Sequence, residues 1–172
     1  TLVSSKKMYI TFMLVQFSVG NFRSFKDVVT LDLTATNLVS KNKDIDENNT
    51  FEASGGLRLL KSVVLYGANA SGKSNLLKAL EFMRTFVIDS SRESQAGNPI
   101  YTEPFLLDSK TEKEPSFFEV IFILKGVRYR YGFEVTTKEV VSEWLYYTSN
   151  KKESYLFTRD KQEIKVSRNF SE

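Results

Sequence analysis

The sequence predicts an α/β fold, an α+β lobe in which one strand–loop–helix unit is combined with an antiparallel β-meander. Residues 63–66 form a short apolar run of β-type residues, and a loop that begins and ends with glycine follows at 67–72. From residue 73 to about 90, apolar residues recur at spacings of three and four, which is the period of an amphipathic helix. After residue 117 the period changes to two, which is typical of half-buried strands.

The composition excludes several kinds of chemistry. The 172 residues include no His and no Cys, so the chain has no imidazole or thiol nucleophile system, no zinc site and no disulfide. The net charge of +3 permits a nucleic-acid partner but does not argue for one. No apolar run approaches the ~20 residues of a membrane-spanning helix. We therefore expect a cytoplasmic protein without a membrane partner.

The first part of the chain predicts a β-hairpin. Met13 is a possible start of the natural protein. We therefore expect residues 1–12 to be a leader or an upstream, non-native segment. Residues 14–22 and 28–33 alternate as strands, and the polar turn at 21–27 separates them. The hairpin is thus expected to precede the strand–loop–helix unit.

The rest of the chain is assigned in order. Residues 37–56 are polar and predict a long loop, and residues 57–60 predict a short edge strand. The apolar run at 63–66 predicts the strand before the glycine loop, and residues 91–115 are irregular, with three prolines. The meander follows, with Lys125-Gly126 as a tight turn and its aromatic side chains packed across strands. Its expected strands are 117–124, 127–135, 140–148, 155–158 and 164–166.

The glycine loop carries the chemistry. Residues 67–74 read Gly-Ala-Asn-Ala-Ser-Gly-Lys-Ser and fit the phosphate-binding pattern G-x-x-x-x-G-K-[ST] at every fixed position. The two glycines let the backbone curl, so that its N–H groups can surround an anion together with the N-terminus of the following helix. Lys73 supplies charge for the β- and γ-phosphates, and the Ser74 hydroxyl can ligate Mg²⁺. The candidate nucleotide-binding residues are Gly67, Ala68, Asn69, Ala70, Ser71, Gly72, Lys73 and Ser74.

The loop and its surroundings resemble a known family. The run from Gly67 to Asn75 is similar to the GxNxSGKSN form of SMC/RecF-type ATPases within the ABC superfamily, which adds Asn75 to the candidate residues. The run Asn-Phe-Arg-Ser-Phe at 21–25 resembles the turn after the first strand of these proteins. With the aromatic-rich run at 117–145, these motifs resemble AAA-type ATPases related to OLD-family and abortive-infection proteins of bacteria, over roughly residues 13–160.

This resemblance implies function and further site residues. It implies binding of ATP with Mg²⁺, and ATP hydrolysis by the full-length protein in DNA maintenance or phage defence. In that family the segment matching 22–25 lies near the nucleotide, so Arg23 and Ser24 become candidate phosphate or ribose contacts. An ordinary polar hairpin turn is the other interpretation of these two residues. Phe22 and Phe25 are expected to be core anchors, and stacking on the adenine base is the alternative.

Hydrolysis by such an ATPase needs a Walker B strand, which is an apolar run ending in Asp and usually Glu. The run ending at Asp108 is too short and follows Pro104, whereas the run ending at Asp32 and the Ser-Gly-Gly at 54–56 lie before the loop. We therefore identify no catalytic residue in this chain. We expect the N-terminal half of an ABC-type ATPase head, inactive alone, whose full-length protein forms a homodimer through its C-terminal part.

The expected domain organisation follows from this. Residues 13–172 would be a partial head, with the hairpin, loop and helix at 13–95 and an antiparallel β subdomain at 116–168. A P-loop GTPase or nucleotide kinase is an alternative, although no N/T-K-x-D motif lies on a late strand. A non-catalytic nucleotide-binding interaction module is another. DNA is a possible partner, for which Arg128 and Arg130 on one strand face offer a small basic stripe, although an ordinary solvated sheet face is the favoured interpretation of these two residues.

Overall fold

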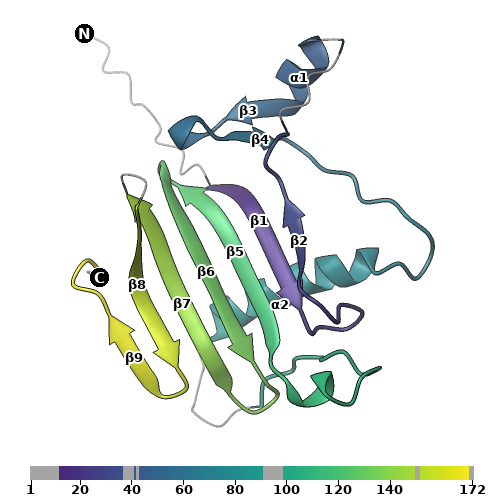
Figure 1. Ribbon diagram of the computed structural model, residues 1–172, viewed down its shortest axis with the longest axis vertical. Helices are drawn as coiled ribbons and strands as arrows, with labels where there is room; N and C mark the ends of the chain where they lie inside the picture. Colours follow the sequence, from purple (N-terminus) through teal and green to yellow (C-terminus); the bar gives the residue numbers. More distant parts are fainter. Residues whose placement is uncertain (1–11, 37–40, 42, 91–98, 150–151, 171–172) are drawn as a thin grey trace.

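The computed structural model describes residues 12–36, 41, 43–90, 99–149 and 152–170. Its main feature is an antiparallel sheet of seven strands in the order β2-β1-β5-β6-β7-β8-β9 (Figure 1). The expected leader lies outside the described residues except for Phe12. The strands of the sheet are β1 (Phe12–Gly20), β2 (Val29–Asp32), β5 (Ser116–Leu124), β6 (Val127–Val135), β7 (Val140–Ser149), β8 (Lys152–Asp160) and β9 (Glu163–Val166).

The expected hairpin and the expected meander belong to this one sheet. β1 pairs antiparallel with β2, and on its other side it pairs with β5 from Phe12↔Leu124 to Gly20↔Phe117. A bulge at Val15 interrupts the register, since Leu14 pairs with Phe122 and Gln16 with Ile121. The segment before the glycine loop and the segment after it therefore share a core.

The meander forms as the alternation predicts. β5 and β6 are joined by Lys125-Gly126, both of which have positive φ (51° and 84°), as a two-residue hairpin turn requires. Across this pair Phe118 lies opposite Phe133, with ring centroids 5.2 Å apart, which confirms the expected cross-strand packing. β8 is longer than the alternating residues 155–158 suggested, because β7 offers it a partner over its whole length.

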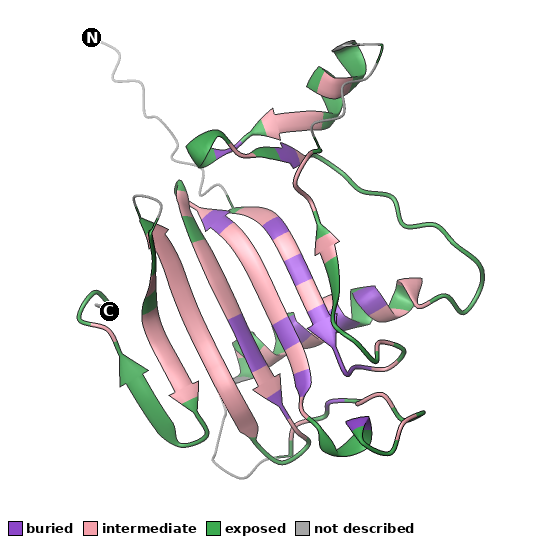
Figure 2. Cartoon of the chain, in the orientation of Figure 1, coloured by how far each residue is buried: buried purple, intermediate pink, exposed green. Residues whose placement is uncertain are grey.

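The core lies between the sheet and the helix α2 (Lys73–Ser90), which has the bounds that the periodicity predicts. The helix crosses behind β1, β5 and β6, where the buried residues are concentrated (Figures 1 and 2). Phe82 of α2 packs on the ring of Phe118 at 4.8 Å, and Phe86 packs on Phe133 at 4.2 Å. Burial of these rings is what holds the helix on the sheet. The buried core residues are Phe17, Val19, Phe22, Leu76, Ala79, Met83, Phe118, Phe133 and Val135.

The segment expected to be one long loop at 37–56 contains regular structure, so that expectation is wrong where the chain is described. It holds the helix α1 (Lys43–Asn49), the strand β3 (Thr50–Glu52) and a 3₁₀ turn (Ser54–Gly56). β3 pairs with β4 (Arg58–Leu60), which confirms the short strand expected at 57–60. Leu59 is fully buried in a second small core with Val15, Ala53 and Ile123. This non-local burial orders a segment whose own polar sequence gives little sign of structure.

The strand expected at 63–66 is also absent from the described structure. Residues 61–71 are exposed throughout and belong to neither sheet, and Figure 1 shows them as an arc that leaves β4 and returns at α2. Val64 is 78% exposed and Tyr66 90% exposed. An apolar run becomes a strand only when a neighbouring strand pairs with its N–H and C=O groups, and no sheet edge in the described residues does so here.

No helix in the described part of the chain is long and apolar enough to cross a membrane.

Candidate nucleotide-binding site

The candidate site is the loop at 67–72 together with the first turn of α2. Gly72 has φ of 89°, and a Cβ there would lie 3.0 Å from Ser24 Oγ, so both its conformation and its surroundings demand glycine. Ala70 has φ of 64°, which gives the loop a second left-handed residue. A Cβ at Gly67 would approach Ser71 Oγ to 3.1 Å. The loop thus curls tightly on itself, as an anion-binding nest does.

Lys73 lies across this curled loop. Its Nζ donates to the carbonyl oxygens of Gly67 at 2.9 Å and Ala68 at 2.7 Å, and to Ser71 Oγ at 3.3 Å. These acceptors hold the ammonium against the loop backbone. A phosphate group brought to the loop would meet this positive charge first.

The N-terminus of α2 adds further donors. The amides of Asn75 and Leu76 bond to the Gly72 carbonyl at 2.9 and 3.1 Å, whereas Lys73 and Ser74 open the helix, where amides have no intrahelical acceptor. The first turn contains no acidic residue that would offset the positive end of the helix dipole. Anions are therefore favoured at this end.

Ser74 is exposed, which leaves its hydroxyl accessible as a metal ligand. No cluster of three or more Asp or Glu side chains able to hold a metal forms within the described residues. A magnesium ion at this loop would therefore be held by Ser74 and phosphate oxygens. This arrangement fits Mg²⁺, which keeps several waters and binds with few protein ligands.

The turn after β1 packs directly against this loop. Ser24 Oγ accepts a hydrogen bond of 2.9 Å from Asn75 Nδ2, and the Phe25 ring lies 3.6 Å from the position of a Cβ on Gly72. Residues 22 and 25 close the turn with two backbone hydrogen bonds of 2.9 Å. The structure thus brings Ser24 to the glycine loop over a separation of about fifty residues, and the role of Ser24 towards a ligand stays a prediction. Phe22, 2% exposed and packed on Phe82, is a core anchor as expected.

Arg23 contacts Glu103, in the irregular segment before β5. Its guanidinium forms an ion pair with Glu103, and its amide donates to the Glu103 carbonyl at 2.7 Å. Arg23 also has positive φ (51°), and its buried Nε has no hydrogen-bond partner in the described structure. The structure therefore joins Ser24 to the glycine loop but gives Arg23 another contact, so a role of Arg23 towards nucleotide would require it to leave Glu103.

Asn21 anchors a distant segment of the chain through side-chain hydrogen bonds, which the sequence pattern did not predict. It is 7% exposed, and its Nδ2 donates to the carbonyls of Thr111 at 2.7 Å and Glu114 at 2.8 Å. Its Oδ1 accepts from the Phe105 amide at 3.0 Å. These bonds fix the irregular segment 99–115 against the turn. The only local sign in the sequence is an Asn directly after a strand, where a left-handed residue is common.

The two aspartates of the rejected Walker B-like runs have local structural contacts. Asp108 forms an ion pair of 2.9 Å with Lys26, and hydrogen bonding from Lys26 lowers the pKa of Asp108 and raises that of Lys26. Asp32 accepts hydrogen bonds from Gln16 at 2.9 Å and from the Thr34 amide at 2.8 Å. Both carboxylates hold loops and strand ends in place.

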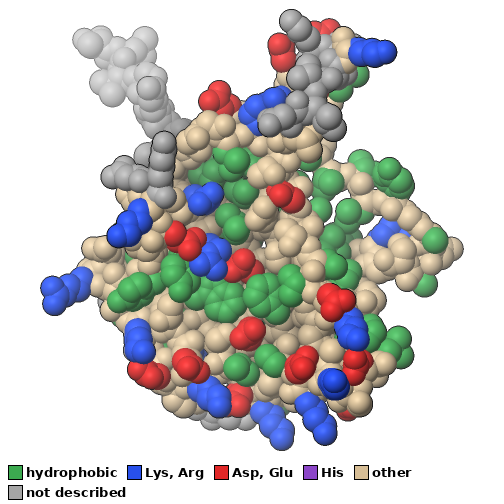
Figure 3. Space-filling view, in the orientation of Figure 1, with side chains coloured by type: hydrophobic (Ala, Val, Ile, Leu, Met, Phe, Trp, Pro, Cys, Tyr) green, Lys and Arg blue, Asp and Glu red, His purple; other side chains and the backbone are tan. Residues whose placement is uncertain are grey.

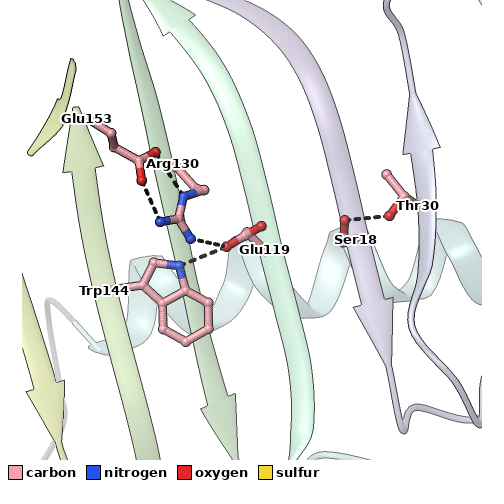
Figure 4. Close-up of polar contacts among 6 residues, drawn as sticks. All are labelled: Ser18, Thr30, Glu119, Arg130, Trp144 and Glu153. Atoms are coloured by element: carbon pink, nitrogen blue, oxygen red, sulfur yellow. Dashed lines mark hydrogen bonds and ion pairs between the residues drawn. The ribbon is translucent and has the colours of Figure 1, made fainter. Parts of the chain in front are cut away.

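The basic stripe considered for β6 includes Arg130, which forms ion pairs with neighbouring strands. Arg130 donates to Glu153 at 2.7 and 3.1 Å and to Glu119 at 3.0 Å (Figure 4). The hydrogen bonds that Arg130 donates to Glu153, and then the one it donates to Glu119, raise the pKa of Arg130, and the contact with Arg130 lowers the pKa of Glu153. Two carboxylates compensate the one guanidinium, so Arg130 presents no net positive charge to a phosphate backbone.

Comparison with known families agrees with the loop geometry. The sequence model of a family described as "AAA domain, putative AbiEii toxin, Type IV TA system" matches residues 62–172. The chain belongs to this AAA family. The matched part includes the glycine loop, α2 and the strands β5 to β9, whereas β1, β2 and the turn with Arg23 and Ser24 lie before it. No curated protein matches the chain closely enough to be counted as a relative.

Membership confirms the resemblance seen in the motifs and has two consequences. It implies a P-loop NTPase fold, to which the glycine loop and α2 correspond. AAA domains in general are nucleotide-binding ATPase domains that bind ATP with Mg²⁺.

Proposed function

We propose that this AAA-family chain binds ATP and Mg²⁺ through residues 67–75. The observation that carries the proposal is the curled loop at the N-terminus of α2, with Lys73 bonded to the loop carbonyls. On binding, phosphate oxygens replace the loop carbonyls as acceptors for Lys73, and the helix amides bond to the phosphate chain. Ser74 ligates the metal ion.

The surrounding residues complete this site. Asn75 donates a hydrogen bond of 2.9 Å to Ser24, so the turn after β1 fixes the position of the loop relative to the sheet. In the ligand-bound state Arg23 would exchange Glu103 for a phosphate or ribose group. Both contacts are proposals for the ligand-bound state.

The chain is proposed to be the N-terminal half of an ABC-type ATPase head. The exposed apolar run at 63–66 supports this, because a P-loop NTPase places the residues before its glycine loop in a parallel sheet. Such a sheet would come from a further part of the polypeptide, which would also carry Walker B. The seven-stranded sheet would then be the antiparallel subdomain on the other side of α2.

In the full-length protein we infer ATP hydrolysis, with homodimerisation through that further part. The family description names an abortive-infection toxin and a toxin–antitoxin system, which supports a role in phage defence over general DNA maintenance. DNA as a direct partner is less well supported, because Arg130 is compensated by Glu119 and Glu153.

A binding assay with a fluorescent ATP analogue and Mg²⁺ tests the proposal. Lys73→Ala should weaken binding by roughly tenfold or more, since a hydrogen bond to a charged group contributes about 1.5–3 kcal/mol. Lys78→Ala is the matched control, because Lys78 is an exposed lysine on the same helix, and it should bind as wild type does. Equal binding by wild type and Lys73→Ala would contradict the proposal. Displacement by GTP as effective as by ATP would favour a GTPase instead.

A further inference from the structure

The face of the sheet opposite α2 carries a row of aromatic side chains. Phe118 and Phe133 point to the helix, so their neighbours Phe117 and Gly132 face the other way. Trp144 pairs with Gly132, and Tyr146 pairs with Arg130 and, on its other side, with Tyr155. Figure 3 shows a band of hydrophobic side chains across the middle of this face. We name Phe117, Trp144, Tyr146 and Tyr155 the aromatic row.

Trp144 is held flat across β6. A Cβ on Gly132 would lie 2.4 Å from Trp144 Cζ2 and 2.6 Å from Cε2, so the indole occupies the space that glycine leaves. Its Nε1 donates to Glu119 at 2.9 Å, and Phe117 packs beside it with ring centroids 5.8 Å apart. Figure 4 shows the indole face-on from the open side of the sheet. The ring is therefore fixed in place with one π-face towards solvent.

The charges around this row are mostly negative. The outward positions of β5 to β8 carry four carboxylates, Glu119, Glu134, Glu153 and Asp160, against two guanidinium groups, Arg128 and Arg130. Arg130 is already paired with two of these carboxylates and lies 4.5 Å from the Tyr146 ring centroid. This excess of negative charge contrasts with the net charge of +3 of the whole chain.

These observations select one class of partner. A fixed π-face flanked by carboxylates attracts Lys and Arg side chains through cation–π and ionic contacts. Aromatic side chains are enriched where proteins contact each other, whereas a nucleic acid needs positive charge for its phosphates. We propose that the aromatic row is a docking surface for a basic polypeptide segment of a partner protein, with a Lys or Arg side chain stacked on Trp144. This surface is separate from the nucleotide site and does not depend on it.

Trp144 is the only tryptophan in the chain, so its fluorescence reports on this surface directly. The whole chain is titrated with a peptide of alternating Arg and Gly residues, and separately with an alternating Glu and Gly peptide of the same length. The expected result is a saturable change of emission with the Arg peptide that weakens as salt is added, and no change with the Glu peptide. No saturable response to the Arg peptide, or an equal response to single-stranded DNA, overturns the proposal.

Variants of the chain test whether the Arg peptide binds at the aromatic row. Their affinity is measured by the fluorescence anisotropy of a labelled Arg peptide. Trp144→Leu should weaken binding about fivefold to tenfold, whereas Tyr101→Leu should leave it unchanged, because Tyr101 is an exposed aromatic outside the row. The double variant Glu134→Gln, Asp160→Asn keeps Trp144 and tests the charges if Trp144→Leu does not fold. It should weaken binding and flatten the salt dependence. Wild-type affinity in the double variant, or in folded Trp144→Leu, refutes the proposal.

Discussion

Replacing Asn21 by Ala should destabilise the fold strongly, although Asn21 belongs to a surface turn by sequence. The change removes the side chain that bonds to Thr111, Glu114 and Phe105, which leaves buried carbonyls and an amide without their partner. Each such hydrogen bond contributes about 1 kcal/mol net, so three give about 3 kcal/mol. Ala in the left-handed conformation at φ of 45° adds roughly 1 kcal/mol.

The expected loss of about 4 kcal/mol is a large part of a typical stability of ~5–15 kcal/mol. It corresponds to a decrease in Tm of about 8–16 °C for a chain of this size. Urea denaturation followed by circular dichroism measures the change in the free energy of unfolding. The matched variant Asn21→Gly keeps the left-handed conformation and loses only the hydrogen bonds, so it should be about 1 kcal/mol more stable than Asn21→Ala. A loss below ~1 kcal/mol in Asn21→Ala would refute the reasoning.

Three further changes test other contacts. Gly132→Ala forces a methyl group into the Trp144 ring and should cost about 1–3 kcal/mol and shift the Trp144 emission spectrum; an unchanged spectrum would argue against the flat indole. Gly72→Ala should lower the free energy of unfolding by about 1–2 kcal/mol and abolish the binding of ATP measured by calorimetry. The reason is that Gly72 has φ of 89° and that an added Cβ would lie close to Ser24. Retained binding would show that the loop tolerates a Cβ. Glu153→Gln should lower stability at pH 7, and this loss should shrink as the pH is lowered. Hydrogen bonding from Arg130 lowers the pKa of Glu153, so its stabilisation is present above the unfolded-state pKa and disappears as the pH falls through the folded-state pKa. A stability difference that does not change with pH would contradict the assigned pKa shift.

Local patterns predicted those parts of the fold that local interactions determine. The helix α2 has an amphipathic repeat and a glycine loop as its start, and both of its bounds were predicted. The turn at Lys125-Gly126 follows from its own backbone preferences. The segment containing α1 and β3 was expected to be a loop, because its own sequence is polar. It is ordered by the pairing of β3 with β4 and by the burial of Leu59 against Val15 and Ile123, which lie far from it in the sequence.

In the candidate site too, local features were predicted from the sequence and contacts between distant residues were not. The loop at 67–74 could be recognised because each of its residues acts through its own backbone or side chain. The hydrogen bond between Ser24 and Asn75, the ion pair of Arg23 with Glu103 and the contacts of Asn21 join residues 51, 80 and about 90 positions apart. No periodicity in one sequence encodes such pairings. The strand expected at 63–66 failed for a related reason, since apolar residues specify a strand only together with the strand that pairs with them.

The measurement that tests the central claim most directly is the affinity of the wild-type chain for ATP, ADP and AMP with Mg²⁺, determined by calorimetry. If the loop and Lys73 hold the β- and γ-phosphates, ATP and ADP should bind, and AMP should bind at least about tenfold more weakly, since it lacks the groups that accept from Lys73. Removing Mg²⁺ should weaken the binding of ATP more than that of AMP. Equal affinity for ATP and AMP would contradict the assignment of residues 67–75 as the phosphate site.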